Sequence, residues 1–255
     1  MTDSYGLLTD LQWQVIQPIL NTGARWRQLD LRMVVTAIFY KDRTGCQWRF
    51  VPADLPCWQS VAYYFYRWQR LGLVERLNQR VNELDREQAG REVHPSVLSI
   101  DSQSVKLGPR ICEHRGTDGG KKVNGRKRSI ATDTGGRIWA AQVTAANIHD
   151  SKSAITMLVQ LPGQRLELMV GDKAYNGAFK KACQAAGLRF ELGSRPESEK
   201  GFVPVSKRWT VERTFAWMAF HRQLAHDFCF NPACHRAWIF MFNISICLKR
   251  LTNST

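Results

Sequence analysis

The sequence predicts a mixed α/β sheet flanked by helices and preceded by a small all-helical region. Up to about residue 86, apolar residues recur at helical spacing in short segments. From residue 96 onward, short apolar runs typical of strands alternate with helical segments, a pattern typical of a sheet with helices on its faces. The polar stretch 85–95 contains a glycine and a proline and separates the two patterns. We therefore expect domains at 1–90 and 96–255.

Four helices are predicted in the first domain. The apolar spacing places them at 7–20, 30–42, 57–71 and 73–86. Thr9 or Asp10 is suited to cap the first helix, and Asp30 to cap the second. The dipeptide Thr44-Gly45 is expected to end the second helix, with an extended piece at 46–50. Short helices with tight connections predict a small bundle, and a helix-turn-helix is one arrangement that fits.

The third predicted helix, 57–71, has two interpretations. Its many aromatic residues are typical of a core-facing stripe, which leaves the arginines in solvent. The same helix also resembles a recognition helix that presents Tyr64, Arg67 and Arg70 to a nucleic-acid groove. One face can pack while the other binds, so both interpretations stay open.

Five strands and four helices are predicted in the second domain. The strands are expected at 96–101, 128–133, 137–143, 166–170 and 188–192. The helices are expected at 150–161, 176–186, 208–224 and 232–251. The tripeptide Thr134-Gly135-Gly136 predicts a hairpin turn between the second and third strands. Residues 193–207 are expected to form a polar loop.

The chain carries a formal net charge of +14, and this charge is unevenly distributed. Up to Pro95 there are 12 basic and 10 acidic residues, whereas the remainder has 24 basic and 12 acidic ones. Such a surplus favours a polyanionic partner, either nucleic acid or anionic lipid. The densest basic stretch runs from Lys106 to Arg128, and it reads equally well as a solvated loop or as a phosphate-binding strip. A lipid surface is disfavoured, because this stretch is glycine-rich and has no aromatic or leucine face.

Several other protein classes are disfavoured by the sequence. It contains no run of eighteen apolar residues, so we expect no membrane span. The beginning of the chain has an early acid and no apolar core, which argues against a signal peptide. The seven cysteines show no paired spacing and are expected to be reduced thiols of a cytoplasmic protein.

Three carboxylates stand where they can act together. Asp101 ends the first predicted strand, Asp172 follows the fourth, and Glu212 lies on the helix after the polar loop. If the two strands are neighbours, their ends bring both aspartates to one edge of the sheet. Converging carboxylates repel each other, and Mg²⁺ removes that repulsion while binding phosphate oxygens. Taken singly, each aspartate fits a turn cap and Glu212 fits an exposed ion pair, but the joint pattern favours a metal site.

Four stretches of the chain carry a family resemblance. They are SVLSIDSQSVK, KKVNGRKRSIATDTGGRIWAAQVTAANIHDSKSA, VGDKAYNG and KRWTVERTFAWMAFHRQLAHDF. With them, nearly the whole chain resembles the bacterial insertion-sequence transposases of the IS4/IS5 superfamily, IS5 family, in the DDE class. The resemblance implies a ribonuclease-H-like fold in the second domain and catalytic, metal-binding roles for Asp101, Asp172 and Glu212. It also matches the family's arginine four positions before the glutamate, here Arg208.

The resemblance further implies what such a protein does. Its N-terminal helices would bind the terminal inverted repeats of the element in double-stranded DNA. With two Mg²⁺ ions, for which Mn²⁺ is expected to substitute, water would cut the element ends and the freed 3′-hydroxyls would attack target DNA. Joining two ends implies a homodimer on paired ends, in the cytoplasm and associated with the nucleoid.

This chain departs from the broader family pattern at two positions. Val205 and Ala219 replace a tyrosine and a lysine of that pattern. Arg213, His221 and Arg222 are candidates for the missing cation. The basic residues expected to contact DNA are Lys106, Lys121, Lys122, Arg126, Lys127, Arg128, Lys173, Arg208, Arg213 and Arg222.

Other residues and the fold itself allow three alternative interpretations. Trp209 and Trp217 are suited to stack on an unpaired base, although an apolar helix face favours a core position. His226, Cys229, Cys234 and His235 have a spacing that fits no common zinc site. In place of a transposase, the fold can serve a catalytically silent DNA-binding protein or a structure-selective nuclease. Cleavage and joining assays separate these functions.

Overall fold

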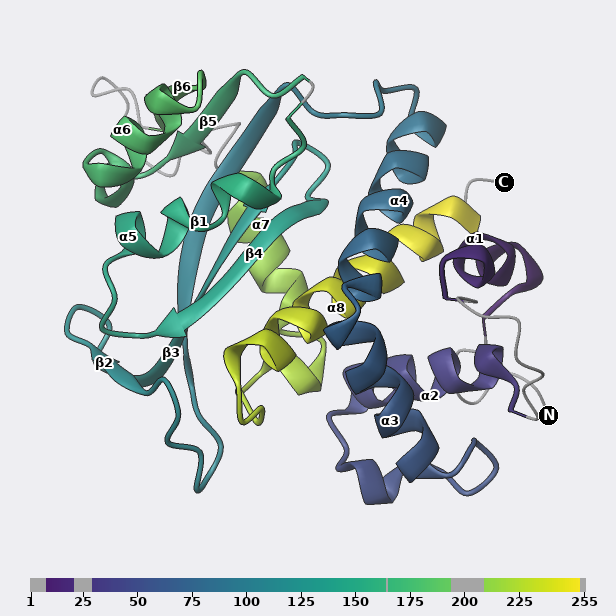
Figure 1. The fold of residues 1–255 in the computed structure, drawn as a ribbon. Coiled ribbons are helices and arrows are strands. Elements are labelled where there is room, and N and C mark those ends of the chain that lie inside the picture. Colours follow the sequence, from purple (N-terminus) through teal and green to yellow (C-terminus); the bar gives the residue numbers. More distant parts are fainter. Residues whose placement is uncertain (1–7, 21–28, 164, 194–208, 253–255) are drawn as a thin grey trace.

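The computed structural model describes residues 8–20, 29–163, 165–193 and 209–252. Its centre is a six-stranded mixed sheet with helices on both faces, and further helices lie beyond one face (Figure 1). This arrangement confirms the predicted fold class of a mixed sheet with an N-terminal helical region. Within the described residues, no helix combines the length and the apolar character needed to cross a membrane.

The four N-terminal helices occur where the apolar spacing predicts them. They are α1 (Asp10–Leu20), α2 (Leu31–Thr44), α3 (Trp58–Arg70) and α4 (Leu73–Gln88). The Asp30 carboxylate caps α2 by accepting from the amide of Arg32 at 2.8 Å, and Gly45 ends the helix with φ +65°. The prediction of an extended piece at 46–50 is wrong, because Trp48–Phe50 form a 3-10 turn, η1.

The first helix begins with a reciprocal cap. The Thr9 hydroxyl accepts from the amide of Gln12 at 3.2 Å, and the Gln12 side chain accepts from the amide of Thr9 at 3.1 Å. Thr9→Ala removes one of these bonds and should lower the free energy of unfolding by about 1 kcal/mol, measured by urea denaturation. Thr9→Ser keeps the hydroxyl and should match the unmodified chain. Equal losses in both variants would contradict this role for Thr9.

The sheet is built around two long antiparallel strands. Its strands are β1 (Val97–Lys106), β2 (Gly116–Asp118), β3 (Val123–Thr132), β4 (Ile138–Ala145), β5 (Leu168–Gly171) and β6 (Arg189–Leu192). Strand β3 pairs antiparallel with β1 on one edge, and with β2 and then β4 on the other. Strands β5 and β6 extend the sheet beyond β1 in parallel. The predicted hairpin turn is confirmed, since the amide of Asp133 donates to the carbonyl of Arg137 at 3.1 Å.

The sequence placed several boundaries incorrectly. Strand β1 continues past its predicted end at residue 101, and β3 begins before its predicted start at residue 128. Both are longer because their polar residues pair with each other, from Ser99 to Lys106 on β1. Strand β2 was not predicted. The helix expected at 150–161 divides into α5 (Asp150–Ile155) and the 3-10 turn η2 (Leu158–Gln160). The remaining helical elements are η3 (Lys173–Tyr175), α6 (Ala178–Ala185), α7 (Trp209–Met218), η4 (Arg222–Leu224) and α8 (Pro232–Thr252).

Each face of the sheet has its own hydrophobic core. Leu98 and Ile100 of β1 face the core formed with α5 and α6. Ile130 of β3 faces the opposite core, which α7, α8 and the N-terminal helices share. The rings of Phe65 in α3 and Trp238 in α8 stack at 4.2 Å within this second core. Helix α8 thus lies between the sheet and the N-terminal helices (Figure 1).

Candidate active site

Asp101 lies in β1, and Asp172 directly follows the neighbouring strand β5. Strands β1 and β5 are parallel, with Val97 opposite Leu168 and Ser99 opposite Val170. Continuing this register by two residues sets Asp172 opposite Asp101. The prediction that Asp101 ends its strand is wrong, because β1 continues to Lys106 through its pairing with β3. Neighbouring strands are about 4.8 Å apart, so the two aspartates are expected side by side where β5 ends beside the middle of β1, a position called here the carboxylate edge.

Backbone amides orient both carboxylates. Asp101 accepts from the amide of Ser102 at 2.7 Å, and Asp172 accepts from the amide of Ala174 at 2.9 Å. Both side chains are only partly buried, which leaves them accessible from the surface. Each aspartate therefore has a fixed direction before any ligand binds.

The hydroxyl of Tyr175 lies within this acidic environment. The Tyr175 side chain is fully buried in the α6-side core. Burial raises the pKa of Tyr175 well above its usual value, and Asp101, Asp150 and Asp172 raise it further. One hydroxyl thus senses the charges of all three aspartates. Tyr175 stands three residues after Asp172 in the VGDKAYNG motif, but the sequence pattern did not single it out.

Helix α7 carries Glu212 past β1. The helix packs on β1 and β3. The guanidinium of Arg128, in β3, lies over the ring of Phe215 in α7 and donates to the side chain of Gln103 in β1, so it links α7 to β1. Glu212 stands three residues before Phe215, which is about 4.5 Å along the helix axis. It therefore lies within one helical turn of the contact between α7 and the sheet.

The flank of α7 that carries Glu212 faces away from the β3–β4 hairpin. Thr214 donates its hydroxyl proton to the carbonyl of Gly136 in that hairpin at 3.1 Å. Two helical residues span about 200°, so Glu212 lies on the opposite flank of α7. Asp101 belongs to the strand face that α7 covers, because Leu98 and Ile100 point to the other face. Glu212 is thus exposed on a helix that lies on the face of the sheet to which Asp101 points.

These donors have the chemistry of a hard-cation site. All three are carboxylates, and Mg²⁺ takes a few carboxylate oxygens together with water and phosphate oxygens. Their oxygens do not form a closed group: among the described residues, only Asp227, Cys229 and His235 place three ligand atoms within 4.8 Å of one another. The three carboxylates thus suit an open site that substrate phosphates complete.

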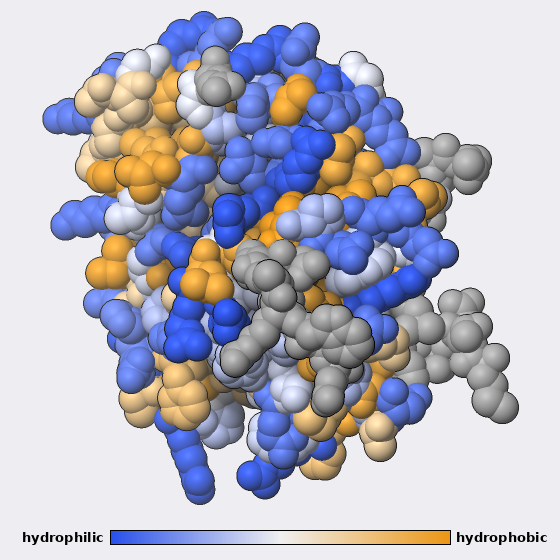
Figure 2. Space-filling view, turned by 45° about the vertical axis from the view of Figure 1, so that its right-hand side comes forward, coloured by the Kyte–Doolittle hydropathy of each residue, from blue (hydrophilic) through white to orange (hydrophobic). Residues whose placement is uncertain are grey.

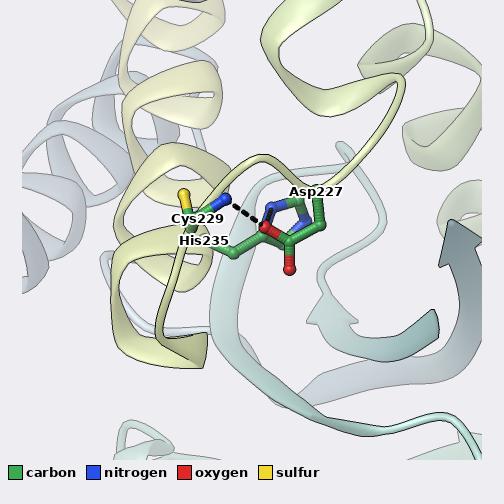
Figure 3. Close-up of side chains that lie close together, drawn as sticks. All are labelled: Asp227, Cys229 and His235. Atoms are coloured by element: carbon green, nitrogen blue, oxygen red, sulfur yellow. Dashed lines mark hydrogen bonds and ion pairs between the residues drawn. The ribbon is translucent and has the colours of Figure 1, made fainter. Parts of the chain in front are cut away.

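The closed group at Asp227 is a poor metal site (Figure 3). The Asp227 carboxylate is already bound by the guanidinium of Arg126 at 2.8 Å and by the amide of Cys229 at 2.8 Å. A hydrogen bond with Cys234 and burial raise the pKa of Cys229 well above its usual value, so its sulfur stays protonated. The group serves as a buried polar network, and the exposed His226 is not part of it.

Three of the basic residues expected to contact DNA are buried, which corrects that prediction. Arg126 is fully buried against Asp227. The ammonium of Lys127 lies 2.6 Å from the carboxylate of Asp150. Arg128 is buried and donates to a backbone carbonyl of η4 at 2.7 Å. The physical reason is that this basic run forms strand β3, which is covered on both faces, whereas its glycines suggested a loop.

The other expected DNA contacts divide between packed and exposed positions. The ring of Tyr64 packs on Trp68 at 5.4 Å and is half-buried in the core. His221 is buried and hydrogen-bonded to Asp42, so it offers no surface cation. Arg213 is half-buried between two indoles. The exposed positions are Arg67, Arg70, Lys106, Lys121, Lys122, Lys173 and Arg222. Arg208 and Val205 lie outside the described residues.

The surface on the side of the N-terminal helices is mostly hydrophilic, with hydrophobic groups between the polar ones (Figure 2). On α3, this exposed surface includes the rings of Tyr63 and Tyr66. Arg67 donates to the Tyr63 hydroxyl at 2.8 Å, which holds the two side chains together. Helix α3 therefore both packs and exposes a cationic, aromatic face, as the two open interpretations allowed.

Comparison with known proteins agrees with this arrangement. Residues 8–78 match a family described as "Putative transposase of IS4/5 family", and residues 93–248 match the "Transposase DDE domain" family. A relative from Burkholderia cepacia, "Putative transposase for insertion sequence element IS402", is 28% identical over 137 residues, covering 50% of this chain. "Uncharacterized protein y4sN" from Sinorhizobium fredii is 26% identical over 117 residues, covering 45% of this chain and 87% of that protein.

The extent of these matches decides what they establish. The alignment covers 64% of the length of the Burkholderia cepacia relative, less than two thirds of that protein. The DDE-domain match, in contrast, covers more than half of this chain. Together with the mixed sheet flanked by helices, that match confirms the resemblance and the ribonuclease-H-like fold. The chain belongs to the DDE transposase family of the IS4/IS5 type.

Proposed function

We propose that this protein is a DNA transposase that cuts the ends of an insertion sequence and joins their 3′-hydroxyls to target DNA. The observation that supports the proposal is the parallel register of β1 and β5, which, continued by two residues, pairs Asp101 with Asp172. Glu212 would complete the set from the exposed flank of α7. Phosphoryl transfer needs positioning and charge neutralisation more than covalent help from the protein. An accessible carboxylate edge in a chain of net charge +14 suits a polyanionic substrate.

In the proposed reaction, residues at the carboxylate edge would bind metal, orient the aspartates and meet a phosphate. Asp101, Asp172 and Glu212 would hold two Mg²⁺ ions, or Mn²⁺ in their place. Bound there, the ions would activate the attacking oxygen and stabilise the leaving oxygen. The backbone amides of Ser102 and Ala174 fix the aspartate directions, which lowers the ordering needed when substrate arrives. Lys173 follows Asp172, is exposed, and is placed to meet a phosphate beside the edge.

The N-terminal helices would supply end recognition through the exposed face of α3. Substituting both Arg67 and Arg70 by alanine should weaken binding to inverted-repeat duplex at least tenfold, since each removes a cation from that face. Fluorescence anisotropy measures this effect. Gln59→Ala, on the same helix and also exposed, is the matched control and should bind like the unmodified chain. Undiminished binding by the double variant would assign end recognition to another surface.

The experiment that tests the proposal is a strand-transfer assay with DNA bracketed by the inverted repeats that flank the gene. In Mg²⁺, the chain should cut both ends and produce joined target DNA. Cleavage without joining would identify a nuclease, and binding without cleavage would identify a silent DNA-binding protein. Joining two ends also requires two active sites, so a homodimer should form on paired ends. Light scattering of the DNA complex measures that mass.

A further inference from the structure

Five arginines gather around only two carboxylates at one end of the molecule. The group comes from α4 and the residues just after it, the β3–β4 hairpin, α7 and the end of α8. Its cations are Arg86, Arg91, Arg137, Arg213 and Arg250, and its anions are Asp85 and Asp133. A cleft of about 440 Å³ opens among them, lined by all of these except Arg86 and Asp133.

The two carboxylates are already engaged by three of the arginines. Asp133 lies 2.6 Å from Arg86 and 3.3 Å from Arg137. Asp85 lies 2.7 Å from Arg137 and 3.2 Å from Arg250. Arg91 donates to the hydroxyl of Thr134, and neither it nor Arg213 has a carboxylate within 4.0 Å among the described residues. The cleft therefore carries an excess of positive charge that its own acids do not neutralise.

The guanidinium of Arg213 is held in a fixed position. It lies 4.6 Å from the ring of Trp209 and 4.6 Å from the ring of Trp217, one helical turn to either side on α7. Arg250 lies over the Trp217 ring at 5.4 Å. The Nε atom of Arg213 is buried and has no partner within the described structure. Burial and the neighbouring Arg250 lower the pKa of Arg213, and a bound anion relieves this crowding of charge.

We propose that this cleft binds backbone phosphates of duplex DNA, with Arg213 and Arg91 as the contacting cations. The inference rests on the proposed transposase function and adds to it a second contact surface. The two tryptophans then act as supports that orient Arg213, in place of the base-stacking role considered from the sequence. A rigid guanidinium beside an indole loses little side-chain freedom when it meets a phosphate.

The position of the cleft agrees with a single duplex that reaches the catalytic edge. The cleft and Glu212 lie on opposite flanks of α7, since Thr214 and the hairpin border the cleft side. A helix is about 10–12 Å across with its side chains, similar to the width of a DNA major groove, about 12 Å. Phosphates on either side of one groove can therefore meet both flanks of α7.

The test measures the salt dependence of DNA binding by the full chain. A fluorescent random-sequence duplex is titrated across a series of NaCl concentrations, because phosphate contacts act on any sequence. Arg91→Ala and Arg213→Ala should each reduce the slope of log affinity against log salt by about 1, and weaken binding at low salt. Arg80→Ala removes an exposed charge from α4 outside the cleft and should leave the slope unchanged.

The outcomes separate this inference from the proposed function. If both cleft variants keep the unmodified slope, the cleft does not bind DNA, even where strand transfer proceeds. If Arg213→Ala lowers the thermal midpoint of unfolding but leaves the salt slope unchanged, Arg213 contributes only to packing. That result would overturn the inference. Arg91 is exposed, so its variant reports on binding without disturbing the core. Absence of any salt-dependent binding by the unmodified chain would overturn the transposase proposal as well.

Discussion

Asp172→Asn is expected to lower the rate of Mg²⁺-dependent strand cleavage by about 10²–10³-fold, the scale seen when one preorganised charge is removed from a transition state. Asparagine has the same shape, and its side-chain oxygen can still accept from the amide of Ala174. The substitution therefore removes charge from the edge while the local turn remains. Asp101→Asn should act alike, because the parallel register of β1 and β5, continued by two residues, pairs Asp101 with Asp172.

The matched control is Asp10→Asn, which removes the same charge from an exposed position at the start of α1. Its cleavage rate should equal that of the unmodified chain. The double variant at Asp101 and Asp172 should be scarcely slower than either single one, because residues that serve one site act as a unit. Full activity of either single variant would contradict the assignment, and independent, multiplying losses would indicate two separate sites.

Arg126→Met is expected to lower the free energy of unfolding by about 3–5 kcal/mol, the range for removing one partner of a buried ion pair. Arg126 and Asp227 are both fully buried, 2.8 Å apart. The same guanidinium donates to the backbone carbonyls of Glu113, Cys229 and Phe230. The variant thus leaves the buried Asp227 carboxylate without its guanidinium and removes the donors from three carbonyls. Urea denaturation of the full chain measures the loss.

The control for the buried pair is Arg80→Met. Arg80 is exposed and lies 3.2 Å from the partly buried Glu83, and its loss should change stability by less than about 0.5 kcal/mol. Adding Asp227→Asn to Arg126→Met should recover part of the stability, because it removes the stranded charge. An additive further loss in the double variant would show that the pair contributes only through packing.

The pH dependence of stability supplies a second check on this pair. Burial raises the pKa of Asp227, but His235, the amide of Cys229 and Arg126 outweigh burial and hold the pKa below its usual value. A depressed pKa in the folded state stabilises the protein above the unfolded pKa, about 3.9, and this stabilisation is lost as the pH falls below it. In Arg126→Met, the guanidinium no longer lowers the pKa of Asp227, so burial raises that pKa relative to the unmodified chain. The stability difference between variant and unmodified chain should therefore narrow as the pH falls, and a constant difference would contradict the charge argument.

The helices and the aspartate edge were predictable because local patterns determine them. Apolar spacing alone located α1 to α4, and Asp30 and Gly45 mark the ends of α2. Asp172 directly follows β5 and Asp101 lies within β1, so the parallel pairing of these strands was enough to place the two aspartates near each other. The pairing itself depends on long-range contacts, which the sequence indicated only through the family resemblance.

The fate of the basic run in β3 was not predictable from local pattern. Arg126, Lys127 and Arg128 follow a glycine and have no apolar residue between them, a pattern that suggests a solvated loop. Their partners come from distant segments, Asp227 for Arg126 and Asp150 for Lys127. Charged residues become buried only where such partners exist, and a single sequence does not show which distant acid meets which base. The cleft around Arg213 escaped prediction for the same reason.

The central claim is that Asp101 and Asp172 bind a divalent cation together at one edge of the sheet. Crystals soaked in Mn²⁺ test it directly through anomalous scattering. The account predicts an anomalous peak in contact with carboxylate oxygens of both aspartates. No peak at this edge with the metal present elsewhere, or two carboxylates facing opposite sides of the sheet, would contradict it.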